Sequence, residues 1–88
     1  MYLAEVVGTV VSTTKDERLV GFKLLLTRRL DEPADKTSAQ VAIDTVGAGA
    51  GETVIVATGG AARHASGRSD CPVDAAIVAI VDTVEHEG

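Results

Sequence analysis

Aromatic side chains are nearly absent from this sequence, and positive charge is in the minority. Tyr2 and Phe22 are its only aromatic residues, and eight Lys and Arg stand against thirteen Asp and Glu, a formal net charge of −5. Modules that bind single-stranded nucleic acid stack bases on aromatic rings above a basic groove. A negative chain repels phosphate and anionic lipid. We therefore expect neither a nucleic acid partner nor a membrane partner.

Cysteine and long apolar runs are scarce as well. Cys71 is the single cysteine, so an internal disulfide is excluded and a reducing cytoplasm is the expected compartment. The longest uninterrupted apolar run, residues 75–81, is far shorter than the roughly 20 residues of a membrane helix. The first residues, MYLAEVV, lack the basic region of a signal peptide. The sequence thus predicts a cytoplasmic protein without an export signal.

Aliphatic residues dominate what is present. Apolar residues make up 45% of the 88-residue chain. A single domain of this size, residues 1–88, buries only roughly 60–65% of the surface that its unfolded chain exposes. So many aliphatic side chains on so small a domain predict apolar surface left over for a partner.

Five segments rich in Val, Ile, Leu and Thr predict strands, and almost nothing predicts helix. They are residues 2–12 with a bend or bulge at Gly8, 22–30, 40–46, 53–58 and 73–84. The leucines at 24–26 would also suit a helix, but the glycine before them favours a strand. Polar segments at 13–18 and 31–39 predict a turn and an exposed loop, and Gly59 to His64 permits one helical turn at most. The pattern is typical of an all-β fold, a small five-stranded OB-like barrel with one short helical turn.

The last of these strands has apolar residues on both faces. Ile77, Ala79 and Val81 alternate with Ala76, Val78 and Ile80. Because the chain offers almost no helix to cover the second face, we expect a neighbouring subunit to cover it.

The most distinctive segment is a glycine loop with glycines at positions 47, 49 and 51, followed by Glu52. The dinucleotide-binding fingerprint needs glycine in the place of Glu52 and a crossover helix after the loop. A β-branched strand follows instead, and no Lys-Ser or Lys-Thr pair completes a phosphate-binding loop. Glycine this frequent indicates a bent backbone or close approach to another surface.

Candidate chemical groups do not form a pattern of catalysis or metal binding. Cys71 and His64 could act as nucleophile and base, yet Pro72 adjoins the thiol and no third orienting group is evident, so a half-buried structural cysteine is the better interpretation. His64, His86, Asp70 and Asp74 match no metal-ligand spacing. We expect no enzyme activity, no cofactor and no metal.

The ordered set of motifs resembles the vertex proteins of bacterial microcompartments, the EutN/CcmL family of pentameric shell proteins. The resemblance covers essentially the whole chain. It is carried by Met1-x-Leu3, Gly8-x-Val10-Val11, Lys15, Leu19, Gly21, Lys23 and Leu24, then by Asp44-x-Val46-Gly47-Ala48-Gly49-x-Gly51-Glu52, Gly59, Ala62-Arg63 and Pro72-Val73-Asp74-Ala75-Ala76-Ile77-Val78.

The resemblance implies an OB-like barrel that assembles into a homopentamer and caps the fivefold vertices of a polyhedral protein shell. The expected partners are other copies of the chain and the hexameric and trimeric shell proteins that tile the facets. Glycine density suggests that the turn from Gly59 through Gly60 and Ala61 to Ala62 borders a narrow opening on the fivefold axis. The residues expected in subunit or hexamer contacts are Gly47, Ala48, Gly49, Gly51, Glu52, Arg63, Pro72, Val73 and Asp74.

Other functions remain open at this point. Arg63 could pair with Asp74 or Glu52 across a subunit boundary, or could be exposed. An OB-type module could still bind nucleic acid or another ligand. A small oligomeric enzyme could hold a pocket between subunits, for which Cys71, His64 and Asp74 are the candidate groups.

Overall fold

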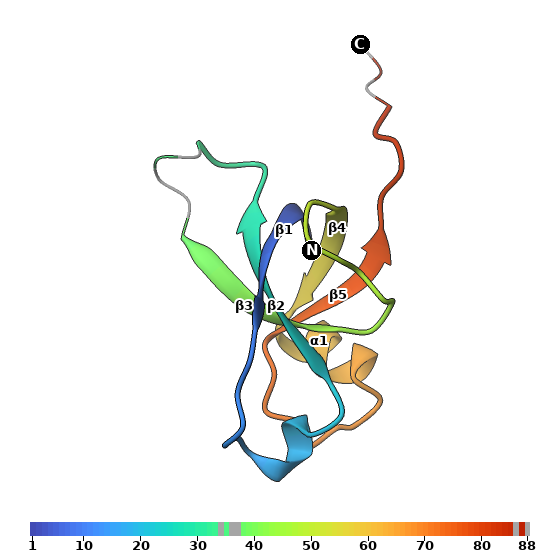
Figure 1. Ribbon diagram of the computed structural model, residues 1–88. Coiled ribbons are helices and arrows are strands. Elements are labelled where there is room, and N and C mark those ends of the chain that lie inside the picture. Colours follow the sequence, from blue (N-terminus) through green and yellow to red (C-terminus); the bar gives the residue numbers. More distant parts are fainter. Residues whose placement is uncertain (34, 36–37, 86, 88) are drawn as a thin grey trace.

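Five strands form a closed barrel in the computed structural model, which describes residues 1–33, 35, 38–85 and 87 (Figure 1). Around the barrel the strands follow the order β1-β2-β3-β5-β4. The all-β barrel expected from the sequence is confirmed. The elements are β1 (Tyr2–Val10), the 3-10 turn η1 (Glu17–Leu19), β2 (Lys23–Arg29), β3 (Ala39–Asp44), β4 (Thr53–Thr58), α1 (Gly59–Ala65) and β5 (Ala75–Ile80).

Antiparallel pairing joins the barrel everywhere except between β3 and β5. That parallel pair is short, with Ile43 opposite Ala76 and Asp44 opposite Ile77. Thr45 extends it, because its hydroxyl and its backbone N–H both donate to the carbonyl of Ile77, at 2.7 and 3.3 Å. The register of β1 against β2 shifts next to Gly8, which confirms the expected bulge.

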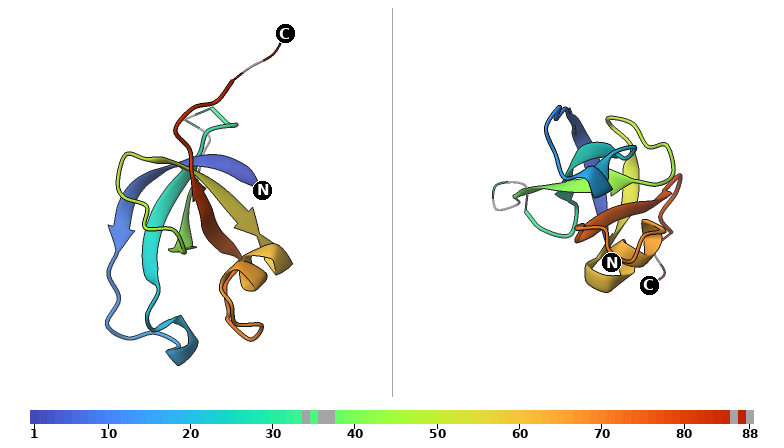
Figure 2. Two further views of the ribbon diagram at one scale, coloured as in Figure 1. Left: turned by 90° about the vertical axis from the view of Figure 1, so that its right-hand side faces the viewer. Right: turned by 90° about the horizontal axis from the view of Figure 1, so that it is seen from below.

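The chain forms two hydrophobic cores, one within the barrel and one beneath α1. The inner core comprises Tyr2, Ala4, Val6, Leu25, Ala42, Ala48, Val54, Val56, Ala75 and Ile77. The second comprises Ile43, Ala62, Cys71, Val73 and Ala76, with Leu19, Phe22, Leu24, Ala65 and Val78 packed against them. Figure 2 shows that α1 lies at one side of the barrel, next to the last residues of β4 and the first residues of β5.

The helix is longer than the sequence predicted. Gly59 to His64 was expected to form one turn at most, whereas α1 spans seven residues, Gly59–Ala65. Tertiary packing supplies the difference, because Ala62 is fully buried in the second core. The helix also covers part of β5, so the expectation that a neighbouring subunit would cover its second face is wrong for the part that includes Ala76.

The ends of several strands also differ from the predicted ones. β5 was expected over residues 73–84 and spans Ala75–Ile80, and β1 ends at Val10 instead of residue 12. The polar segment 13–18 leads into η1, which was not predicted; Asp16 caps it by accepting a hydrogen bond from the Arg18 N–H at 2.9 Å. In the expected loop 31–39, residues 34, 36 and 37 lie outside the described residues. Within the described ranges, no helix is long and apolar enough to span a membrane.

Candidate functional site

The glycine loop between β3 and β4 is fixed to the barrel by backbone hydrogen bonds. Gly51 donates its N–H to the carbonyl of Val6 at 2.8 Å, and Val6 donates to the carbonyl of Glu52 at 3.0 Å. Ala48 is fully buried in the inner core. The loop is therefore a packed part of the barrel, and the side chain of Ala48 is directed into its own subunit.

Glycine is favoured at the three positions of this loop for different physical reasons. Gly47 and Gly51 have positive φ angles of 81° and 87°, which other residues rarely adopt. Gly49 does not; there a Cβ atom would lie 3.4 Å from Oε1 of Glu52. That oxygen accepts a hydrogen bond from the Gly49 N–H at 2.6 Å. The carboxylate of Glu52 therefore stabilises the conformation of the loop.

Lys23 contacts the loop from β2, and this contact was not predicted. Its ammonium group donates to the carbonyl of Ala48 at 2.5 Å and lies 3.6 Å from the carboxylate of Asp44. The side chain of Asp44 is only 3% exposed and also accepts from the Val46 N–H at 3.1 Å. Since β4 follows the loop directly, the crossover helix of a dinucleotide site does not occur here.

The second glycine turn forms the start of α1. Gly59 has a positive φ of 59°, and its N–H donates to the carbonyl of Asp74 at 3.0 Å. Gly60 and Ala61 are exposed, whereas Ala62 is fully buried. Of the turn expected at a fivefold axis, the structure therefore leaves three residues on the surface and places one in the second core.

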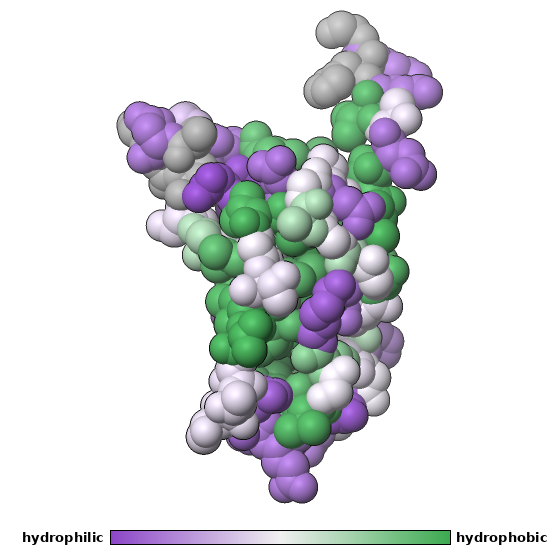
Figure 3. Space-filling view, in the orientation of Figure 1, coloured by the Kyte–Doolittle hydropathy of each residue, from purple (hydrophilic) through white to green (hydrophobic). Residues whose placement is uncertain are grey.

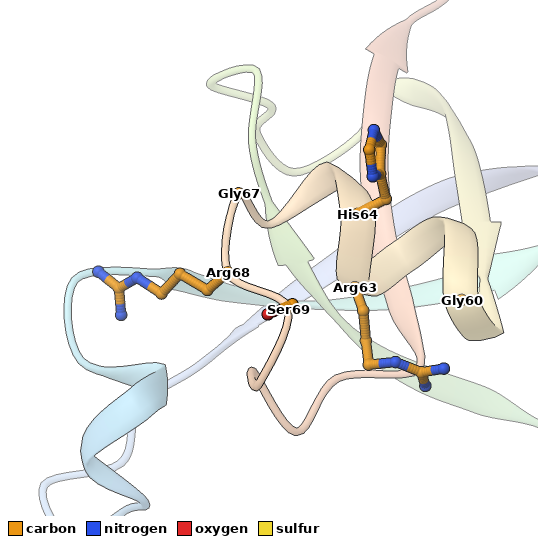
Figure 4. A pocket seen from close by; sticks show the side chains of 6 residues that line it. All are labelled: Gly60, Arg63, His64, Gly67, Arg68 and Ser69. Carbon is orange, nitrogen blue, oxygen red and sulfur yellow. The ribbon is translucent and has the colours of Figure 1, made fainter.

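A shallow hollow of about 460 Å³ lies beside this helix. It is lined by three basic residues, Arg63, His64 and Arg68, and by three small ones, Gly60, Gly67 and Ser69 (Figure 4). The two arginines point in different directions from it. Arg68 reaches toward η1, where it donates to the carbonyl of Arg18 at 3.0 Å and stacks 5.1 Å from the ring centre of Phe22. The charges do not converge on one point, so the hollow is not organised to hold an anion.

Arg63 is exposed and has no ion pair within the described part of the chain. Of the two acids considered as its partners, Glu52 holds the N–H of Gly49, and Asp74 is exposed. A pairing of Arg63 with either acid of a neighbouring subunit stays a prediction.

The groups considered for catalysis and metal binding are not assembled into a site. Cys71 is 1% exposed rather than half-buried, and its thiol contacts the carbonyl of Arg18 at 3.5 Å, whereas His64 is exposed. Among the described residues, no three His, Cys, Asp or Glu side chains are grouped to hold a metal ion. His86 lies outside the described residues.

The segment before β5 borders a second, apolar hollow of about 190 Å³. Pro72 and Asp74 are exposed beside it, and Val73 is 9% exposed. The other lining residues are Leu19, Leu24, Val41, Ile43 and Ala75. Of the predicted contact residues, Pro72, Val73 and Asp74 thus border apolar surface at this hollow.

Comparison with known proteins assigns the chain to a family. Residues 1–82 match the family described as "Ethanolamine utilisation protein EutN/carboxysome". The chain belongs to the EutN/CcmL family. A relative within the family, the microcompartment shell vertex protein GrpN of Rhodospirillum rubrum, is 56% identical over 86 residues, which cover 97% of each chain.

Solved structures of EutN/CcmL proteins have the same barrel. The pentameric microcompartment shell protein GrpN from Rhodospirillum rubrum matches over the whole of both chains with a TM-score of 0.83 and 53% identity. The CcmL protein of Gloeobacter violaceus matches with a TM-score of 0.86 and 40% identity, over 99% of this chain and 91% of that one. The resemblance seen in the sequence is confirmed, and the named relatives are shell vertex proteins.

Proposed function

We propose that this chain forms homopentamers that close the fivefold vertices of a bacterial microcompartment shell. The observation that carries the proposal is the match, along the whole chain, to a pentameric shell protein and to relatives named as shell vertex proteins. A planar layer of hexamers cannot close on itself, so fivefold units supply the curvature between facets. The protein acts mechanically, in the cytoplasm, as one domain over its full length.

Its partners are other copies of itself and the hexameric and trimeric proteins of the facets. Outer edges of the pentamer dock against hexamer edges. Among the residues predicted to make contacts, the exposed ones support this role: Gly47, Gly51, Arg63, Pro72 and Asp74. Gly49 and Glu52 contribute less directly: the hydrogen bond between them stabilises the loop in which the exposed Gly47 and Gly51 lie.

The turn of Gly59 to Ala61 borders the opening on the fivefold axis. Support comes from its exposure and from the lack of crowding at Gly60, where a Cβ atom would meet only Arg63 Nη2, at 3.7 Å. A small, exposed residue at this position would let five copies of the turn approach one another around the axis. Gly60→Leu should fold as a subunit and fail to form the ring; a normal pentamer of this variant would rule out the axial position.

Native mass is the deciding measurement for the proposal. At micromolar concentration the protein should have five times the 9.0 kDa mass of one chain. Mixed with a hexameric shell protein from the same bacterium, it should convert open sheets into closed particles, seen by electron microscopy. A monomer or dimer, or a pentamer that never enters shells, would contradict the proposal.

A further inference from the structure

Strand β3 has an open edge over its first half. On one side β2 pairs with it along its whole length, Ala39–Asp44. On the other side, β5 pairs with it only at Ile43 and Asp44. In the part of the chain that the structure describes, no strand therefore lies beside residues 39–42 on the side away from β2.

The backbone groups of Ala39 and Val41 point toward this open edge. The carbonyl of Gln40 faces β2, since it accepts a hydrogen bond from the Thr27 hydroxyl at 2.9 Å. The N–H of Thr45 faces the other way and donates to β5 at 3.3 Å. Hydrogen-bonding groups of successive residues in a strand point to alternate sides. Ala39 and Val41, like Thr45, thus direct their N–H and C=O groups away from β2.

The apolar hollow of about 190 Å³ lies beside the same edge. β3 contributes Val41 and Ile43 to its lining, and the segment before β5 contributes Pro72, Val73 and Asp74. Side chains of paired residues in neighbouring strands project from the same face of a sheet. A strand added beside Val41 would therefore direct one of its side chains into the hollow.

The edge has none of the usual features that block pairing. Native proteins protect strand edges with charged side chains, proline or a bulge. Ala39, Gln40 and Val41 are uncharged, and their register against β2 is unbroken. Hydrophobic surface lies over β3, on the left of the barrel in Figure 3, and Val41 is 45% exposed. Such an edge can accept an extended peptide, whose main chain bonds to the strand while alternate side chains enter pockets.

Two exposed charges indicate the chemistry of that peptide. Arg28 lies opposite Ala39 at the start of β3, and Asp74 lines the hollow. Neither has an ion pair within the described residues. A basic side chain next to the one in the hollow complements Asp74, and an acidic side chain at the other end complements Arg28.

We propose that Ala39, Gln40, Val41 and the adjoining hollow bind an extended segment of a partner protein, which adds to β3 as a further strand. The segment has an aliphatic side chain for the hollow, with a basic and an acidic residue two positions away on either side. All residues of the site belong to one subunit, so the inference goes beyond the proposed function and does not rest on it.

Two synthetic peptides test this site on the full-length protein in its native assembly. They have the sequences Glu-Thr-Val-Thr-Lys and Lys-Thr-Val-Thr-Glu with blocked ends, so that one of them fits whether the added strand is parallel or antiparallel to β3. The matched controls have N-methyl groups on the three central amides. These controls keep the side chains but lose the donors that a strand needs.

Amide hydrogen exchange, followed by NMR, is the readout. In the free protein the amides of Ala39 and Val41 should exchange rapidly, whereas those of Gln40 and Ala42, which point toward β2, should exchange slowly. At about ten times its dissociation constant, the fitting peptide should slow exchange at Ala39 and Val41 by about tenfold. The N-methylated peptides should leave both rates unchanged.

Variants separate the hollow from the charge. Val41→Asp removes an apolar wall and should weaken peptide binding by about tenfold or more. Asp74→Asn should weaken binding of the lysine peptide but not of the same peptide with glutamine in place of lysine. Val20→Asp is the matched control, because Val20 is 54% exposed and lies outside the site. It should bind the peptide as the unaltered protein does.

Two results would overturn the proposal. One is that neither peptide slows exchange at Ala39 and Val41. The other is that both amides are already protected in the assembled protein and become unprotected in the dilute monomer, because another copy of the chain then covers the edge. Native mass tests the proposed pentamer separately, so failure of peptide binding leaves the proposed function as it stands.

Discussion

Gly51 holds a backbone conformation that an alanine adopts only under strain. Its φ is 87°, and no atom would lie within 4 Å of an added Cβ, so conformation and not crowding sets the effect. Left-handed backbone costs a residue with a Cβ about 1–2 kcal/mol. Gly51→Ala should lower the free energy of unfolding of each subunit by about that amount, measured in urea at a fixed subunit concentration.

Gly49→Ala is the matched control two residues away. Gly49 has no positive φ, and its Cβ would touch only the end of the Glu52 side chain at 3.4 Å. The loss of stability should be clearly smaller than for Gly51→Ala. Equal losses would mean that crowding or a neighbouring subunit, rather than φ, determines the need for glycine in this loop.

Tyr2 should make the stability of the protein sensitive to alkaline pH. Burial raises the pKa of its phenol above the ordinary value of 10.0, although Arg29, stacked 4.1 Å from the ring centre, opposes the shift. The unfolded chain then releases the proton first. The contribution of this group is complete below pH 10 and is lost as the pH rises from 10 through the raised pKa of the folded state.

Comparison with Tyr2→Phe isolates this effect. The variant loses the hydrogen bond that Tyr2 donates to Oε1 of Gln40, which should lower the free energy of unfolding by about 1 kcal/mol below pH 9. The difference between the two proteins should shrink as the pH rises above 10, measured by urea unfolding from pH 8 to 11. A difference that stays constant across this range would contradict the role of Tyr2.

Between elements, Lys23 joins β2 to the glycine loop and to the end of β3. Lys23→Met removes the donor to the carbonyl of Ala48 and the positive charge beside the buried carboxylate of Asp44. Loss of a hydrogen bond from a charged group costs about 1.5–3 kcal/mol, and partial exposure of the lysine favours the lower end. Urea unfolding should show a loss near 1–2 kcal/mol per subunit.

Lys15→Met is the control for that change. Lys15 also donates to a backbone carbonyl, that of Ser12 at 2.8 Å, but it lies in a polar segment and has no ion pair among the described residues. Its replacement should alter the free energy of unfolding by a few tenths of a kcal/mol at most. A similar loss of unfolding free energy for both variants would show that the ion pair of Lys23 with Asp44 adds no stability.

Strands were predictable from this sequence because alternation and β-branched residues are local signals. Thr53–Thr58 has the predicted bounds, and the bulge at Gly8 was also expected. The helix was underestimated, because the burial of Ala62 that stabilises it depends on Ile43, Cys71 and Val73, which are distant in the chain. The loop support from Lys23 depends on register and has no signature in the sequence.

Apolar residues on the outside of the barrel were only partly foreseeable. Three consecutive leucines, residues 24–26, place apolar side chains on both faces of β2, and that signal is local. Their grouping with Val41 and Val10 requires the register of three strands. Sequence alone therefore indicates that a partner exists, whereas the location of its contact surface comes from the tertiary structure.

At the scale of the whole molecule, one subunit exposes more surface area than is usual for a compact monomer of its mass. It exposes 5478 Å² of accessible surface. A compact protein of 9.0 kDa exposes about 4,900 Å². Residues 81–85 contribute to the difference, since they run away from the barrel after β5 (Figure 1). The subunit thus has surface to bury in an assembly.

If folding and ring formation are one process, thermal stability must depend on concentration. Five chains unfold from one pentamer, so a tenfold rise in subunit concentration should add about 1 kcal/mol of stability per subunit. For a chain of this size that corresponds to a rise of roughly 4–8 °C in the midpoint of thermal unfolding. Calorimetry from 5 to 500 µM should show this slope for the unaltered protein. A concentration-independent midpoint would mean that the barrel is stable without its ring.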